Sequence, residues 1–397
     1  MVGSTVPKSL NESNSQDARN VNVNSISPSV MYTHGNKNDD ANHPFTVFHQ
    51  NMQGLKNKTD ELMLTIDSEM PHLICITEYH LNYMETEVAY IPNYNLAAKY
   101  CRTSKKCGGV CIYIHKNLKY TNINLLIYCK EQDFEIAAVN LKFSCKNVII
   151  LCTYRSPGGN LMYFLDKLDS ILNSLENPKT EFIICGDFNI NYIGVNNKKT
   201  QLENLLNMYN LIGTINFPTR ITTMSCSAID NIFVDKRRNY TIKPYINGLS
   251  DHDAQLLTLN DLVQPVSNPK PCYIRNINKL TIAEFQSLLS EETWEDVFEN
   301  SDVNIMFKNF LNTYLRCFNA CFLKVNISKT NLTRSGWITN GIKTSCKRKK
   351  ELFVLCKITN NYNLKLYYKK YCLILTKVIR NAKNYTTIIL FSDPKTK

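Results

Sequence analysis

Apolar and polar positions along the chain predict more strands than helices between residues 45 and 260. Short apolar runs, typical of buried strands, cover 45–51, 72–77, 110–115, 135–143, 148–154, 181–185, 229–234 and 254–259. Apolar residues at helical spacing cover 55–69, 161–172 and 199–209. Single helices between groups of strands fit neither a strict βαβ repeat nor an all-β sandwich. Two packed sheets with helices outside them satisfy the pattern, which indicates an α/β fold.

The segments on either side of this pattern differ in composition. Residues 1–43 are rich in Ser, Asn and Asp, and we expect them to be disordered, because they bury too little apolar surface to offset the entropy of ordering. Prolines between 265 and 271 mark a linker, and helical spacing recurs beyond it. We therefore predict a disordered segment at 1–43, a globular domain at 44–260, a linker at 261–279 and a helical region at 280–397, with helices over 280–297, 303–325 and from 341 onward.

The composition is that of a globular protein, with 44% hydrophobic residues. No apolar run approaches the ~18–20 residues of a membrane span, and residues 1–10 are too polar for a signal peptide. The 15 cysteines form no C-x-x-C pair, and several lie inside apolar runs, as expected of free thiols in a reducing compartment. Cys107 with Cys111, and Cys317 with Cys321, have a spacing that suggests zinc, but no histidine stands at finger-like spacing. We expect a soluble, intracellular protein with no membrane partner.

The positive charge is concentrated at the C-terminal end. The whole chain has a net charge of +12, and residues 337–397 alone carry 14 Lys and Arg against two acidic residues. The rest of the chain is therefore neutral overall. Such a block suggests contact with a polyanion, most often a nucleic acid. The alternative is a solvated helical face that has lost its partner domain.

Polar residues recur where the predicted strands end. Each alone is as readily a turn former or a capping residue as a functional group. Together they stand in a fixed order, each at the end of an apolar run or just inside it. Gly186 allows the chain to turn directly before one of them. The set comprises Asn51, Glu78, Tyr154, Asp187 with Asn189, Asp230, and the triplet Ser250-Asp251-His252.

This ordered set resembles the endonuclease/exonuclease/phosphatase superfamily, and most closely the apurinic-type endonucleases of non-LTR retrotransposons, over about residues 45–260. The resemblance implies a four-layer α/β sandwich, two packed β-sheets flanked by helices, with a helical C-terminal extension. It also implies that the catalytic groups collect at one edge of the two sheets. Residues 280–397 look like the basic connector that precedes the reverse transcriptase in such elements. No F/Y-x-D-D sequence follows, so we expect a truncated element or a gene fragment derived from one.

The resemblance implies a metal site built from oxygen ligands. Glu78 would be the main ligand of Mg²⁺, with Mn²⁺ as a possible substitute, because Mg²⁺ binds through a few carboxylates and keeps its waters. Asn51 would hold this site by a hydrogen bond to Glu78 or to a metal-bound water, and Asp251 would face the metal. The alternative for Glu78 is a residue that caps or solvates a loop, and for Asn51 a residue tolerated in a turn.

The remaining residues of the set would act on the phosphate and the attacking water. Asp187 would orient and deprotonate the water, and Asn189 would position the water or a phosphate oxygen. His252 would contact the scissile phosphate, with Asp230 bonded to its other ring nitrogen, which fixes the tautomer and favours the charged imidazole. Tyr154 would donate a hydrogen bond to a phosphate oxygen, or else would only pack on the core.

Two positions depart from the pattern of the related nucleases. Pro157 stands where an asparagine often follows the tyrosine, and we hypothesise that Arg155 supplies the missing phosphate contact. Gln53 stands where several relatives have an acid, which puts a second metal position in doubt. In the loop 219–224, Arg220 and Thr222 are candidates for contacts with a DNA groove or backbone. The alternative for this loop is an ordinary turn.

These observations predict a Mg²⁺-dependent endonuclease that nicks one DNA strand and leaves a 3′-hydroxyl for target-primed reverse transcription. DNA would be the main partner, element RNA a second one through the basic region, and the nucleus the site of action; the oligomeric state is open. One alternative is a phosphoesterase of the same fold that acts on RNA tails, phosphoinositides or sphingomyelin. Another is a catalytically inactive relic that binds nucleic acid through residues 337–397.

Overall fold

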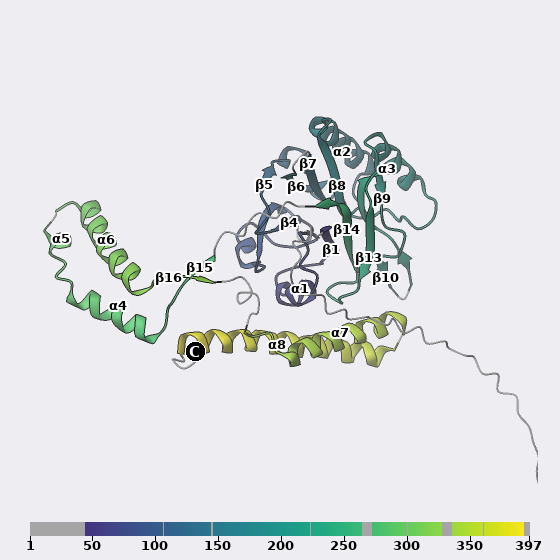
Figure 1. The fold of residues 1–397 in the computed structure, drawn as a ribbon. Coiled ribbons are helices and arrows are strands. Elements are labelled where there is room, and N and C mark those ends of the chain that lie inside the picture. The colour runs from purple at the N-terminus through teal and green to yellow at the C-terminus, as the bar shows by residue number, and fades with distance from the viewer. Residues whose placement is uncertain are drawn as a thin grey trace, which may run out of the picture. The chain divides into compact units, whose positions relative to one another are not determined.

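The computed structural model describes residues 44–392 except 106, 144–145, 223, 264–271, 300, 328–335 and 360. Two six-stranded mixed sheets form its centre (Figure 1). The first sheet has the order β13 (Tyr240–Tyr245), β14 (Ala254–Val263), β1 (Pro44–Asn51), β2 (Leu73–Thr77), β4 (Val110–His115) and β3 (Tyr94–Tyr100). The second has the order β5 (Tyr120–Ile123), β6 (Glu135–Lys142), β7 (Asn147–Tyr154), β8 (Thr180–Asp187), β12 (Asp230–Asp235) and β9 (Leu211–Gly213).

The two sheets pack face to face over a core of small and branched side chains. This core includes Val47 of β1, Ile112 of β4, Val139 of β6 and Ile150 of β7, all fully buried. In each strand these residues alternate with residues of the opposite face, as the period of two along a strand requires. Burial of one face of each sheet against the other therefore fixes the register of both.

Helices cover the outer faces of the sheets. α2 (Leu161–Leu175) and α3 (Asn197–Met208) pack on the second sheet, where Phe164 and Leu202 join a second apolar core. α1 (Thr59–Ile66) covers the first sheet through Leu62 and Ile66. The side chains of Asn160 and Asn196 cap the first turns of α2 and α3. The architecture is thus the predicted four-layer α/β sandwich.

The predicted strands and the two helices on the second sheet are confirmed, whereas four strands were missed. The missed strands are β3, β5, β9 and β13, each at an edge of its sheet. Edge strands are partly exposed and therefore lack a continuous apolar run, as the alternating burial of β13 shows. Two short pairs, β10 (Arg220–Ile221) with β11 (Cys226–Ser227) and β15 (Cys272–Arg275) with β16 (Lys324–Ile327), were also not predicted.

The helix predicted over 55–69 is shorter than expected. The main-chain N–H groups of Gly54 and Leu55 donate to the carbonyls of Glu78 and Tyr79, so this segment stays beside the loop that follows β2. α1 can begin only after these bonds, at Thr59. The bonds hold the segment after Asn51 against Glu78, which positions the site described below.

The C-terminal extension is helical, as predicted, with interruptions. Its helices are α4 (Lys279–Glu291), α5 (Glu295–Phe298), α6 (Val303–Cys321), α7 (Asn340–Ile358) and α8 (Tyr362–Ser392). The helix predicted over 280–297 is interrupted between Glu291 and Glu295, where Trp294 has a φ of 59°. The helix predicted over 303–325 ends at Cys321, and β16 follows it. The segment 1–43 and the three prolines of the predicted linker lie outside the described residues. None of the helices in the described part of the chain has both the length and the apolar content of a membrane span.

Candidate active site

Strand directions bring the predicted polar residues to one edge of the sandwich. β1 and β2 are parallel in the first sheet, as are β7 and β8 in the second. β14 and β12 run antiparallel to β1 and β8, so they begin at the edge where those strands end. Hydrogen bonds then join residues of both sheets across this edge. The residues brought together are Asn51, Glu78, Tyr154, Asp187, Asn189, Asp230, Asp251 and His252.

The side chain of Asn51 connects the two central carboxylates. Its Nδ2 atom donates to Oε1 of Glu78 at 2.9 Å and to Oδ2 of Asp187 at 2.8 Å. Its Oδ1 atom accepts the main-chain N–H of Gln53 at 3.1 Å, which fixes the orientation of the amide. Asn51 is fully buried. The predicted hydrogen bond to Glu78 is therefore present, and Asn51 holds carboxylates from the two different sheets side by side.

Glu78 is held as a carboxylate. The hydroxyl of Tyr154 donates to its Oε1 atom at 2.9 Å, and Nε2 of His80 lies 3.2 Å from its Oε2 atom. Burial favours the neutral acid, but hydrogen bonds from His80, Asn51 and Tyr154 outweigh this and lower the pKa of Glu78 to about 2. Glu78 is therefore ionised at neutral pH, as a ligand of a divalent cation must be.

Asp230 and His252 form a buried ion pair. Nδ1 of His252 lies 2.8 Å from Oδ2 of Asp230, which also accepts a hydrogen bond from the hydroxyl of Thr219 at 2.7 Å. Burial opposes the imidazolium, but the charges of Asp230, Asp187 and Asp251 prevail and raise the pKa of His252 to about 9. Burial likewise opposes the charge of Asp230, but His252 outweighs it and the pKa of Asp230 is lowered. At neutral pH the imidazole is charged and its Nε2 atom can donate to an anion.

The pKa of Asp187 is raised, whereas the pKa values of Glu78 and Asp230 are lowered. Burial and the negative charge of Asp230 raise the pKa of Asp187 to about 7. Its Oδ1 atom accepts the main-chain N–H of Asn189 at 3.0 Å, and Asn189 has a φ of 50°. The Nδ2 atom of Asn189 donates one hydrogen to the carbonyl of Arg155 at 2.7 Å, which fixes the amide and leaves its Oδ1 atom and its second N–H able to position a water. A carboxyl group with a pKa near 7 is matched to general base catalysis at neutral pH.

The loop residues predicted to contact DNA lie at the rim of the site. The guanidinium of Arg220 pairs with Oδ2 of Asp251, with Nε and an Nη each at 2.8 Å, and both side chains are about one third exposed. The hydroxyl of Thr222 is bonded within its own turn, to Ser225 at 2.9 Å. Thr223 lies outside the described residues. Arg220 is thus partly neutralised by a carboxylate of the site.

The donor set fits a hard divalent cation. Carboxylate oxygens of Asp187 and Asp230 lie within 4.8 Å of each other, and the ionised Glu78 is joined to Asp187 through Asn51. Oδ1 of Asp230 and Oδ1 of Asp251 are buried and have no hydrogen-bond partner among the described residues. Buried acceptors without donors are costly, and a cation or its waters would satisfy them. Carboxylate oxygens in this number suit Mg²⁺ or Mn²⁺.

The prediction that Arg155 contacts phosphate is wrong. Arg155 is 1% exposed, and its guanidinium donates to the main-chain carbonyls of Phe188 at 3.0 Å, Gly159 at 2.7 Å and Asn189 at 3.0 Å. Every one of these bonds points into the protein, which leaves the side chain unable to reach a ligand. Arg155 therefore supports the loop that carries Asn189.

Replacing Arg155 with methionine is expected to lower the free energy of unfolding by about 3 kcal/mol, because it leaves buried carbonyls without donors. Urea unfolding measures this change. Arg348→Met is the matched control, since the side chains of Arg348 and of its partner Glu351 are about half exposed and the change should alter stability by less than ~0.5 kcal/mol. Equal stability of the two variants would contradict the supporting role.

Several residues around the site were not predicted. His80 and Thr219 bond directly to Glu78 and Asp230, and Gln50 donates to the carbonyl of His252 at 3.0 Å. Lys58 donates to the carbonyl of Met52, and burial together with Lys349 lowers its pKa to about 8. His80 follows Glu78 by two positions, a proximity that would have justified including it. Gln50 has no local signal, because its contact with His252 joins segments 202 positions apart.

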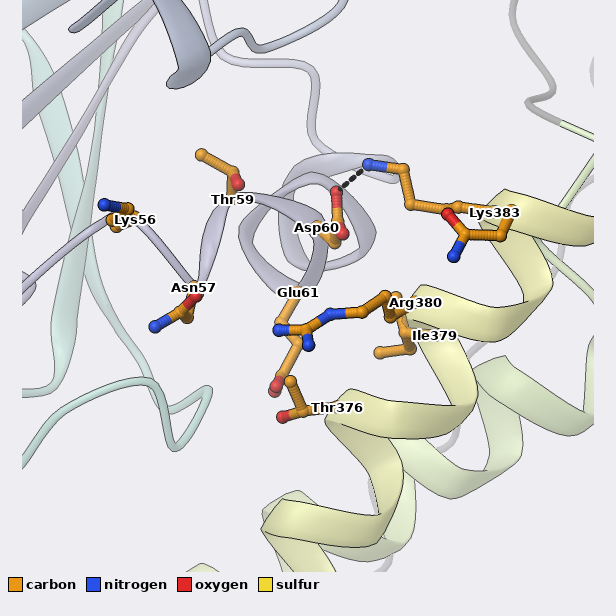
Figure 2. Close-up of a pocket in the computed structure, with 10 residues that line it drawn as sticks. Lys56, Asn57, Thr59, Asp60, Glu61, Thr376, Ile379, Arg380 and Lys383 are labelled. Carbon is orange, nitrogen blue, oxygen red and sulfur yellow. Dashed lines mark hydrogen bonds and ion pairs between the residues drawn. The ribbon is translucent and has the colours of Figure 1, made fainter. Parts of the chain in front are cut away.

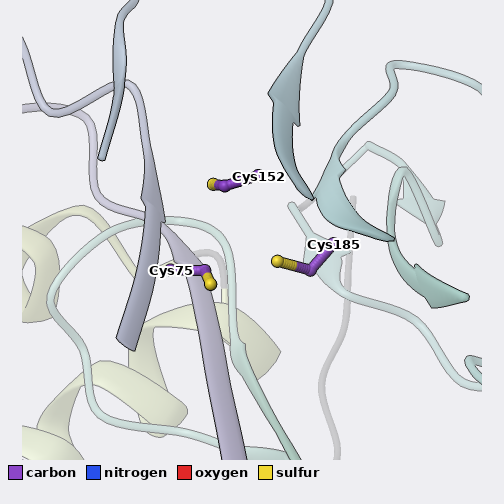
Figure 3. Close-up of side chains that lie close together, drawn as sticks. All are labelled: Cys75, Cys152 and Cys185. Atoms are coloured by element: carbon purple, nitrogen blue, oxygen red, sulfur yellow. The ribbon is translucent and has the colours of Figure 1, made fainter. Parts of the chain in front are cut away.

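Three cysteines meet between the sheets, away from the predicted residues. Sγ atoms of Cys75 on β2, Cys152 on β7 and Cys185 on β8 lie within 4.8 Å of one another (Figure 3). All three are fully buried in the apolar core, and Cys152 and Cys185 donate to main-chain carbonyls at 3.7 and 3.6 Å. Burial raises the pKa of the Cys152 and Cys185 thiols. These side chains pack as small apolar groups, as the cysteine content predicts.

A four-layer sandwich with carboxylates and a carboxylate–histidine pair at one sheet edge defines a class of phosphoester hydrolases. The sequence profile described as the endonuclease/exonuclease/phosphatase family matches residues 47–252, just over half of the chain. The chain belongs to this family, whose members hydrolyse phosphoester bonds and generally depend on divalent metal ions.

Several solved structures are similar to the chain at low sequence identity. The endonuclease domain of TRAS1, a telomere-specific non-LTR retrotransposon, is 16% identical with a TM-score of 0.44, over 55% of this chain and 98% of that domain. The AP endonuclease LMAP from Leishmania major is 14% identical with a TM-score of 0.44, over 55% and 89% of the two chains. TDP2 from D. rerio, complexed with a single-strand DNA product, is 12% identical with a TM-score of 0.42, over 54% and 98%. Comparison with curated protein sequences gives no match.

Proposed function

We propose that the protein is a Mg²⁺-dependent phosphodiester hydrolase that nicks one strand of DNA. The observation that carries the proposal is the single amide of Asn51, which bonds both to Glu78 and to Asp187, beside the buried pair of Asp230 and His252. This arrangement combines a permanently ionised carboxylate, a carboxyl group with a pKa near neutrality and a charged imidazole. Phosphodiester hydrolysis needs these three functions in one place.

The chain's own residues would divide the reaction between them. Asp187 accepts a proton from the attacking water, which Asn189 helps to position through its free Oδ1 atom. His252 donates from Nε2 to a phosphate oxygen, while Asp230 keeps the ring oriented and charged. When bound, Mg²⁺ or Mn²⁺ would neutralise charge on the phosphate, and Glu78 with Asp251 would hold it. Tyr154 donates its one hydroxyl proton to Glu78, so it would orient this ligand in place of the predicted donation to a phosphate oxygen.

The charge distribution favours a nucleic acid as substrate, and we propose that it is DNA. α7 and α8 carry exposed cations, among them Lys347, Lys350, Lys369, Lys370 and Lys377. A basic surface of this kind neutralises backbone phosphates without reading sequence. The product would be a nick with a 3′-hydroxyl suited to priming reverse transcription, as in the retrotransposon endonucleases that the chain resembles. Action on DNA in this manner would place the protein in the nucleus, and the same basic helices could hold element RNA.

Incubation of the protein with supercoiled plasmid tests this function. With Mg²⁺ or Mn²⁺ we expect conversion to the open circle, and with EDTA we expect none, because the phosphate charge is then not neutralised. Parallel incubations with single-stranded RNA, phosphoinositides and sphingomyelin test the alternative, a phosphoesterase of the same fold that hydrolyses one of these substrates. Binding of plasmid without cleavage, under every metal condition, would identify a nucleic-acid-binding relic and contradict the proposal.

A further inference from the structure

α7 and α8 pack against each other and contact the sandwich at two places. The first is α1, where Trp337, Ile342, Leu375 and Ile379 form a small apolar core together with Met63. Ion pairs surround this core. Lys349 of α7 pairs with Glu61, with both side chains 9% exposed. Lys383 of α8 pairs with Asp60 at 2.5 Å, as Figure 2 shows. This contact anchors the two helices on the outer face of α1.

The second contact is with the loop that carries the catalytic histidine. Nζ of Lys357 on α7 lies 2.9 Å from Oδ1 of Asp253, and the two side chains are 11% and 5% exposed. One turn earlier on α7, the ring of Phe353 packs on Gly248, where a Cβ atom would approach it to 3.2 Å. The hydroxyl of Tyr368 on α8 donates to the carbonyl of Gly248 at 3.4 Å. The helices therefore touch both ends of the segment 248–253.

Asp253 is connected to the ion pair of the active site in two ways. It follows His252 directly in the chain, and its main-chain N–H donates to the carbonyl of Thr219 at 2.7 Å. The hydroxyl of Thr219 in turn donates to Asp230, the partner of His252. A displacement of Asp253 would thus move His252 and Thr219 together, and Thr219 is the residue that orients Asp230.

We propose that the pair of helices α7 and α8 sets the position of the catalytic loop 248–253, with Lys357 as a positioning residue for His252. This inference rests on the proposed function, in which His252 contacts the phosphate and its position therefore affects the rate. Lys357 does not face the reacting groups, and it acts through Asp253. Because both side chains are nearly buried, loss of the lysine removes the cation and the hydrogen-bond donor that hold Asp253 in place, and the loop is then expected to shift so that water can reach this carboxyl group. Displacements of about 1 Å in an active site can lower rates about 100-fold.

Three variants of the full chain test this position. Lys357→Met is expected to lower kcat for plasmid nicking about tenfold or more while KM changes by less than about twofold, since the groups that bind the backbone are unchanged. Lys357→Arg should restore kcat to within about threefold of the wild type, because a guanidinium can still pair with Asp253. Lys349→Met is the matched control. It removes one positive charge and one buried ion pair from the same helix, but it does not touch the catalytic loop.

The control separates positioning from general stability. Lys349→Met and Lys357→Met should both unfold at lower temperature, whereas only Lys357→Met should lose kcat at a temperature where each variant is folded. Equal kcat values for these two variants would overturn the proposal. Hydrogen exchange of residues 248–253 adds a readout that needs no substrate. Faster exchange there in Lys357→Met than in Lys349→Met is expected, and equal exchange would overturn the proposal even if the chain cleaves no DNA at all.

Discussion

Replacing Asp187 with asparagine is expected to lower kcat for DNA nicking by about 10³-fold, within the ~10²–10⁴ range that general base catalysis contributes. The asparagine has the same size, and its oxygen can keep the bond from the main-chain N–H of Asn189, so the fold should persist. Its NH2 group replaces the oxygen that accepts from Asn51, so that bond is lost together with the ability to accept a proton from water. Initial rates of plasmid nicking at saturating DNA measure the effect.

The pH profile identifies the cause of this loss. The base acts as a carboxylate, and the pKa of Asp187 is raised to about 7, so the rate for the wild type should fall as the pH drops below about 7. The asparagine variant should lack this acidic limb. Asp235→Asn provides the control, because Asp235 stands at the other end of β12 and pairs with Arg237 away from the site. Equal nicking rates for Asp187→Asn and the wild type would end the enzyme hypothesis.

Replacing His252 with glutamine is expected to lower kcat by about 10²–10³-fold, the usual effect of removing one preorganised donor to a charged transition state. The same change breaks the buried ion pair with Asp230, whose carboxylate then keeps only the bond from Thr219. Breaking a buried pair in this way costs about 3–5 kcal/mol, so the variant should also be less stable. Plasmid nicking and urea unfolding, measured on the same preparation, report the two effects separately.

Deprotonation of His252 is expected to determine the alkaline side of the pH profile. Its pKa is raised to about 9, so both the donor to phosphate and the stabilising charge are present at neutral pH and are lost as the pH rises through about 9. Wild-type activity should therefore decline above about pH 9. The stabilisation is complete below the ordinary histidine pKa of 6.5 and is lost between pH 6.5 and about 9, so stability should decline over that interval, and the glutamine variant should show neither decline. His115→Gln, at the opposite end of the first sheet, serves as the control. A wild-type profile that stays flat up to pH 10 would contradict the assignment.

The pKa values of Asp187 and Asp230 are shifted in opposite directions within the same cluster. Asp187 and Asp230 are both buried carboxyl groups, but only Asp230 is bonded to the imidazole. Asp230 is therefore charged, and its charge raises the pKa of Asp187. Pairs of titratable groups whose pKa values are pushed apart commonly mark the acid and the base of an active site. The third carboxylate, Glu78, is kept ionised by its three hydrogen-bond donors.

Much of the site was predictable because it lies at strand ends. An apolar run followed by Asn51, Glu78 or Asp187 can be recognised locally, and parallel neighbours in a sheet bring such ends to one edge. The four missed strands show the limit of this approach, since edge strands expose one side and lose the continuous apolar pattern. Arg155 shows another limit. Its place after Tyr154 suggested a side chain directed at the cleft, but the carbonyls of the loop 188–189 hold it inside the protein.

The amino-acid sequence by itself determined the order of the central strands along the chain, the helices on the second sheet and the polar residues at the strand ends. It did so because apolar periodicity and turn residues act over a few neighbouring positions. The tertiary structure alone decided that Asn51 joins two carboxylates, that Asp251 pairs with Arg220, and that Lys357 reaches Asp253. Each of these contacts joins segments distant in the chain, and the burial that shifts the pKa values exists only after the two sheets have packed together.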